Sequence, residues 1–108
     1  MNITTTTARN GETIEVIEYA EWRANMEVRE ANSKQHRHGW QDNAECKMCG
    51  RKMSSAAIAK ARSVHMTTNA QLVRVDIDAS IIDSQGFFEV GSECAKRLPK
   101  GFVTKAGA

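Results

Sequence analysis

The chain has 108 residues, the length of one domain, and 41% of them are hydrophobic but only 6% aromatic. So few large side chains make a modest core, which a bound metal would help to stabilise. Three cysteines do not form a disulfide framework of paired thiols, and no stretch is apolar enough for a membrane span or a signal segment. We therefore expect a cytoplasmic protein with reduced thiols and no membrane partner.

The net charge is only +2, but the charges are unevenly distributed along the chain. Residues 1–45 hold eight acids and five bases. Residues 46–75 hold no acid and six bases: Lys47, Arg51, Lys52, Lys60, Arg62 and Arg74. This block predicts a basic face that could meet an anionic partner, although a solvated face of an ordinary domain has the same composition.

The N-terminal part is predicted to be a hairpin followed by a helix. Residues 3–18 contain Asn10-Gly11, a strong hairpin turn signal, between a threonine-rich run and an alternating run. The apolar period then changes to that of an amphipathic helix over residues 19–32. Residues 33–45 are polar and are predicted to form a loop.

The remaining elements are predicted to be short. A helix over residues 54–62 would have Ser54 or Ser55 as its N-cap. A last helix over residues 93–98 would begin after Ser92 and end before the proline that follows. Between these helices, runs of β-branched and alternating apolar residues predict three strands, over 64–67, 71–77 and 87–90.

These elements predict an α+β fold in three parts. Residues 44–100 would form a small zinc-stabilised domain of a knuckle, a β-hairpin and a short helix. Residues 1–43 would pack on it, and residues 101–108, which hold two glycines and few apolar side chains, would form a flexible tail.

The sequence around Cys46 and Cys49 predicts a metal site. The two cysteines are three positions apart and are followed by Gly50, which lets the backbone turn so that both thiolates face one ion. Cys94 is a third candidate, in the first turn of the last predicted helix, where the helix N-terminus stabilises a thiolate. Zn²⁺ is the ion that we expect.

A structural zinc site needs a fourth ligand. We favour His65, which lies in the strand after the knuckle and could fold back over the cysteines. His38 and then His36 are the alternatives, followed by an acidic side chain or water. A redox use of the Cys-x-x-Cys pair would need a βαβ context, which the following segment does not indicate.

Three stretches resemble a treble-clef-type zinc-binding module. They are Cys46–Lys52, with the pattern C-x-x-C-G-R-K, then Val64–Met66, and Gln85–Pro99 around Cys94. Over about residues 44–100 the chain is similar to small zinc-binding proteins of bacteriophages and mobile elements. The resemblance implies a knuckle, a hairpin and a helix that returns ligands to the zinc. The usual helix supplies two ligands and this one holds a single cysteine, so the fourth ligand stays open.

Three functions are compatible with these features. The first is a non-enzymatic nucleic-acid-binding accessory module, in which Trp40 could stack on a base and phosphates would contact Arg51, Lys52, Lys60 and Arg62. The second is a protein-binding modulator of the phage host-interaction type, pairing through an exposed strand such as residues 3–9. The third is a small zinc nuclease, which the absence of a suitably spaced histidine and acid disfavours. No motif indicates a small-molecule substrate.

Overall fold

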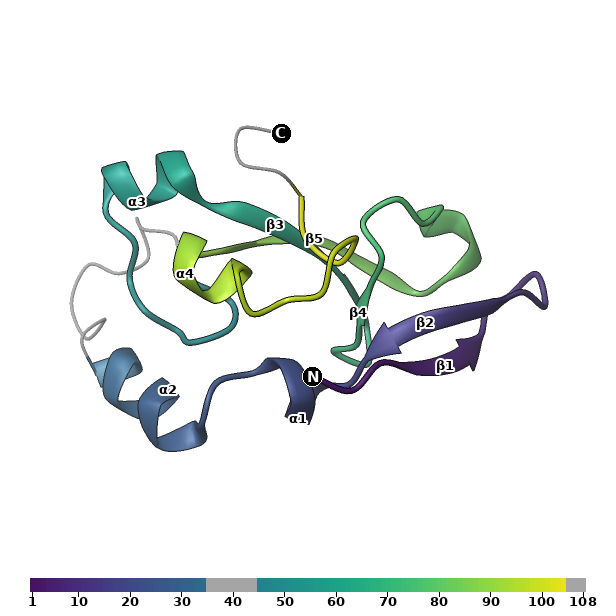
Figure 1. Cartoon of the computed structure of the whole chain (residues 1–108), viewed down its shortest axis with the longest axis horizontal. Helices are drawn as coiled ribbons and strands as arrows, with labels where there is room; N and C mark the ends of the chain where they lie inside the picture. The colour runs from purple at the N-terminus through teal and green to yellow at the C-terminus, as the bar shows by residue number, and fades with distance from the viewer. Residues whose placement is uncertain (35–44, 105–108) are drawn as a thin grey trace.

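The computed structural model describes residues 1–34 and 45–104 and shows one antiparallel sheet of five strands with short helices around it (Figure 1). The strand order across the sheet is β1-β2-β4-β3-β5. The strands are β1 (Thr4–Thr7), β2 (Thr13–Ile17), β3 (Arg62–Thr67), β4 (Leu72–Val73) and β5 (Ser84–Val90). The structure thus confirms a small mixed fold of helices and antiparallel strands.

The helices are all short. They are α1 (Tyr19–Trp22), α2 (Met26–Lys34), α3 (Ser55–Lys60), α4 (Ser92–Ala95) and the 3₁₀ helix η2 (Ala79–Ile81). In the described part of the chain, none of them has the length and apolar character needed to cross a bilayer.

The N-terminal hairpin forms as predicted, with a slightly longer turn. β1 pairs with β2 in a register that places Thr7 opposite Thr13. The amide of Ala8 donates to the carbonyl of Glu12 over 2.8 Å, so three residues form the turn. Gly11 is the last of the three and adopts a φ of 86°, the left-handed conformation that this turn requires.

The single helix predicted over residues 19–32 is broken into α1 and α2. The backbone of Arg23 is extended, with φ −72° and ψ 154°. Asn25 then caps the second helix, because its Oδ1 accepts a hydrogen bond of 2.8 Å from the amide of Glu27. A side chain that satisfies the amides of a new helix start favours two helices over one.

The N-terminal hairpin belongs to the same sheet as the strands of the predicted zinc domain. β2 pairs with β4, with Val16 opposite Val73 and Ile17 opposite Leu72. Within the described residues 1–34, the hairpin therefore contacts the rest of the chain through strand pairing.

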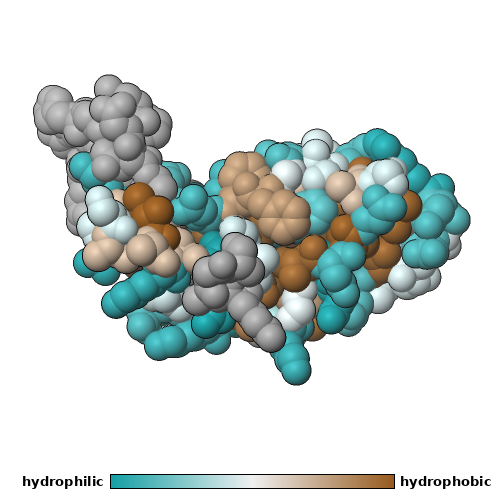
Figure 2. Space-filling view, turned by 90° about the horizontal axis from the view of Figure 1, so that it is seen from above, coloured by the Kyte–Doolittle hydropathy of each residue, from teal (hydrophilic) through white to brown (hydrophobic). Residues whose placement is uncertain are grey.

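The two faces of the sheet carry separate apolar clusters, because neighbouring strand residues point to opposite faces. The larger cluster includes Ile17, Met66 and the buried cysteines. The smaller one is Val16, Val73 and Ile82, and three half-buried isoleucines border it: Ile14, Ile77 and Ile81. Hydrophobic residues also gather at the surface on the side seen in Figure 2, between hydrophilic margins.

The C-terminal segment differs from the flexible tail that the sequence predicts from residue 101. Phe102 is fully buried in the larger cluster. The amide of Thr104 donates to the carbonyl of Ser63 over 3.0 Å, which fixes the segment to the start of β3. Burial of one large aromatic side chain is enough to hold a short segment that is otherwise poor in apolar residues. Residues 105–108 lie outside the described part.

Candidate metal centre

The knuckle is a tight turn between Glu45 and Lys52, which form an isolated β-bridge. The amide of Cys46 donates to the carbonyl of Arg51 over 2.9 Å, and the amide of Gly50 donates to the carbonyl of Cys46 over 2.7 Å. Gly50 has a φ of 77°, which a glycine adopts without steric cost. The glycine after the cysteine pair thus has the conformational role that the sequence indicates.

Helix α2 supports the knuckle from outside through its polar side chains. Nη1 of Arg29 donates to the carbonyl of Lys47 over 2.8 Å, and Nδ2 of Asn32 donates to the carbonyl of Cys49 over 2.9 Å. Sequence reasoning did not find these two residues, since a polar side chain on a helix carries no signal of which loop it will contact. They fix the backbone that carries the thiols.

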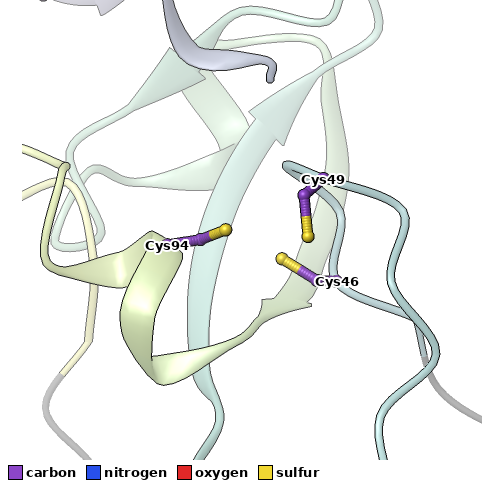
Figure 3. Close-up of side chains that lie close together, drawn as sticks. All are labelled: Cys46, Cys49 and Cys94. Atoms are coloured by element: carbon purple, nitrogen blue, oxygen red, sulfur yellow. The ribbon is translucent and has the colours of Figure 1, made fainter. Parts of the chain in front are cut away.

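Helix α4 brings the third cysteine to the knuckle. The amide of Lys47 donates to the carbonyl of Glu89 over 2.9 Å, so the knuckle lies beside the end of β5, immediately before α4. Figure 3 shows the sulfurs of Cys46, Cys49 and Cys94 pointing toward one another. The three Sγ atoms lie within 4.8 Å of one another. The prediction that these cysteines meet is confirmed.

Without a metal, the three thiols share their protons unequally. The hydrogen bond from Cys94 lowers the pKa of Cys46 to about 5, although burial opposes this shift. The amide of Gly91 also donates to Sγ of Cys46 over 3.2 Å. The same contact with Cys46 raises the pKa of Cys94, and burial raises that of Cys49. The thiol of Cys94 and the amide of Gly91 therefore both stabilise a thiolate at Cys46.

The cluster opens onto a cavity of about 410 Å³. Its other walls include the basic side chains of Arg51 and Lys52 and the first turn of α4, with Ser92 and Glu93. Three soft thiol donors within 4.8 Å are the donor set that Zn²⁺ accepts. The described residues could therefore hold a metal ion through three ligands, with a fourth position to be completed.

The predicted fourth ligand His65 is not brought to this cluster. Val64 and Met66 point to the sheet face that carries the cysteines, so His65 between them points to the other face. There its Nε2 lies 2.6 Å from Oγ of Ser84, and its ring stacks on that of Phe87 at 4.6 Å. The sequence places His65 in the correct strand but does not reveal which way the strand turns it.

Replacement of His65 by alanine should leave about one metal ion per chain, because the imidazole lies on the face opposite to the cysteines. The loss of its contacts with Ser84 and Phe87 should lower the free energy of unfolding by about 1–3 kcal/mol. Metal analysis of the purified variant, beside a urea titration, measures both effects. A folded variant that has lost its metal would make His65 a ligand after all.

The predicted phosphate contacts do not share one site. Arg51 and Lys52 are exposed and line the cavity beside the cysteines. Lys60 is exposed at the end of α3, and Arg62 lines a different cavity. The alternative ligands His38 and His36, and the stacking residue Trp40, lie outside the described residues.

The geometry of the site is thus a cluster of three cysteines that ties the knuckle to α4. Comparison of this chain with protein families, with curated proteins and with solved structures finds no match in any of the three.

Proposed function

We propose that this chain is a small zinc-binding protein that acts as a nucleic-acid-binding accessory module. The observation that carries the proposal is the cluster of three sulfurs within 4.8 Å. It joins the knuckle, which carries Cys46 and Cys49, to Cys94, which lies 45 positions after Cys49 in the sequence. Such a cross-link has a structural purpose in a chain with a modest core.

The arrangement around the metal supports a treble-clef-like reading of residues 44–100. A knuckle supplies Cys46 and Cys49, strands β3 and β5 pair, and the helix that follows β5 returns Cys94. Cys46 and Cys94 are also members of the larger apolar cluster, and Cys49 packs against it, as expected of a stabilising site. In this proposal Zn²⁺ stabilises the fold around the knuckle and takes no part in a chemical reaction.

The basic side chains supply the argument for a nucleic acid. Arg51, Lys52 and Lys60 are exposed around the cysteine cavity and at the end of α3, and Arg62 begins the adjacent strand. Phosphates of a nucleic acid would release counterions when they meet such cations, so affinity would depend on salt. The zinc cross-link would keep the cations of the knuckle at fixed positions.

The metal-loaded protein should bind a labelled oligonucleotide at low salt and lose affinity steeply as salt is added. With four phosphate contacts, the slope of log K against log salt should be about −3 to −4. Fluorescence anisotropy with single-stranded and duplex probes of one sequence measures it. Absence of binding at low salt, or a flat salt response, would contradict the proposal.

A protein partner is the second candidate function, and one observation favours it. β1 is an edge strand of the sheet, and all four of its residues, Thr4–Thr7, are exposed. An exposed edge can accept a strand from another chain through backbone hydrogen bonds. The two candidates differ in salt response, since strand pairing depends far less on ionic strength than phosphate contacts do.

A further inference from the structure

A second cavity, of about 620 Å³, lies between the start of β3, the exit of β4 and the segment that follows α4. Its apolar walls include Val75, Leu98 and Val103. Four basic side chains surround these walls, and no acid lines the cavity among the described residues; the bases are Arg62, Arg74, Lys96 and Lys100. We call this cavity the basic groove.

The C-terminal segment builds the groove by crossing from the exit of β4 to the start of β3. The amide of Val75 donates to the carbonyl of Gly101 over 2.9 Å, just after β4. The segment also bonds to the start of β3, where the amide of Ser63 donates to Oγ1 of Thr104 over 2.9 Å. Figure 1 shows this segment, in yellow, passing in front of β3. Two bases from the chain's middle therefore meet two bases from near its end.

Two of the four cations keep unused capacity for an anion. Nε of Arg62 is buried and has no hydrogen-bond partner within the described residues. No acid of the described chain pairs with Lys100. Arg62 also forms no ion pair with an acid of the described chain, so its charge is available to a phosphate that enters the groove.

The other two cations have acidic neighbours outside the groove. Arg74 lies 3.6 Å from Glu15 and 3.7 Å from Asp76, and Lys96 lies 3.1 Å from Glu93. These pairs are solvent-exposed, so each stabilises by little and can exchange for a phosphate.

Arg74 is also positioned by the turn at Gly101. A Cβ at Gly101 would lie 2.4 Å from Nη2 and 2.7 Å from Cζ of Arg74, so only glycine lets the guanidinium lie against this backbone. The ring of Phe102 lies on the other side, with its centroid 5.8 Å from Cζ. The guanidinium of Arg74 therefore lies against the backbone of Gly101 and near the ring of Phe102.

We infer that the basic groove binds the phosphodiester backbone of a nucleic acid. Four cations around apolar walls suit a chain of phosphates joined by sugars, and two of them, Arg62 and Lys100, have no acidic partner in the described part of the chain. The inference rests on the proposed nucleic-acid function. It places the main contact surface for the nucleic acid at the basic groove and not at the knuckle, on residues that lie in separate parts of the sequence.

The test uses the metal-loaded full chain with Lys96→Ala and Lys100→Ala combined. Both side chains are exposed, so the variant should keep its metal content and its melting temperature. Its affinity for the labelled oligonucleotide should fall on the order of tenfold, and its salt slope should shrink by about two. A matched control combines Arg9→Ala and Arg23→Ala, which remove the same charge from two residues that do not line the groove.

The outcomes separate the groove from the function on which it rests. A loss confined to the Lys96 and Lys100 variant supports the groove. An equal loss of affinity in the control variant would show that binding follows net charge alone and would overturn the inference. Unchanged affinity in the groove variant would also overturn it. Both results would leave the proposed nucleic-acid binding in place. If the unmodified protein binds no oligonucleotide, the proposed function fails and the inference with it.

Discussion

Replacement of Cys46 by serine should abolish metal binding and cooperative folding together. Cys46 is only 2% exposed, and its sulfur accepts a hydrogen bond from the amide of Gly91, the residue just before α4. The free energy of zinc binding in small structural sites is about 10–16 kcal/mol, and a domain's whole stability is about 5–15 kcal/mol. Metal content should fall from about one ion per chain to near zero, and the thermal transition should be lost.

The control for this variant is Ser92→Ala. Ser92 lines the same cavity in the same helix as Cys94 but offers no thiolate, so its replacement should keep the metal and the transition. Treatment of the unmodified protein with a chelator should reproduce the Cys46→Ser result. A Cys46→Ser protein that still bound one ion and melted like the parent would show that the cluster is not the metal site.

The features that the sequence predicts correctly are those with local signals. Asn10-Gly11 marks the hairpin turn because the turn itself needs a residue of positive φ. Ser54 marks the start of α3, where its side chain accepts from the amide of Ala57. The spacing of Cys46 and Cys49 marks the knuckle in the same way, since two thiols three positions apart can face one ion.

Features that depend on distant partners could not be predicted in the same way. His65 illustrates this, because a shift of one residue in strand register moves a side chain to the opposite face. The register of β3 is fixed by pairing with Val73 and Phe87, which lie 8 and 22 positions further along. Local alternation in 64–67 shows a strand but cannot show which face meets the cysteines.

The lengths of the strands and helices could not be predicted from local sequence patterns either. β5 begins at Ser84, earlier than the predicted strand over 87–90, because its first residues pair with β3 across a bulge between Met66 and Thr67. α4 is shorter than predicted and has Gly91, with no side-chain cap, as its N-cap in place of Ser92. Only the first turn, which carries Cys94, is needed for the metal cluster.

Replacement of Trp22 by alanine should cost about 3–5 kcal/mol of unfolding free energy, the cost of removing a large buried aromatic side chain. The indole is 1% exposed and belongs to the same core cluster as Cys46 and Met48. Its Nε1 donates to the carbonyl of Ala70 over 2.8 Å, which fastens α1 to the turn between β3 and β4. This one side chain therefore links the N-terminal hairpin, the sheet and the knuckle.

Two further variants measure how much of that free energy comes from the hydrogen bond of Trp22 and how much from its contact with Tyr19. Trp22→Phe keeps an aromatic ring but loses the bond to Ala70, so about 1–2 kcal/mol should be lost. Tyr19→Ala removes an edge-to-face partner of the indole, with ring centroids 5.0 Å apart, from a position that is 36% exposed, and should cost about 1 kcal/mol. Urea titrations followed by circular dichroism give all three values. Equal costs for Trp22→Ala and Tyr19→Ala would mean that the buried indole does not anchor α1, whereas the predicted order makes Trp22 the side chain that holds α1 against the larger core cluster.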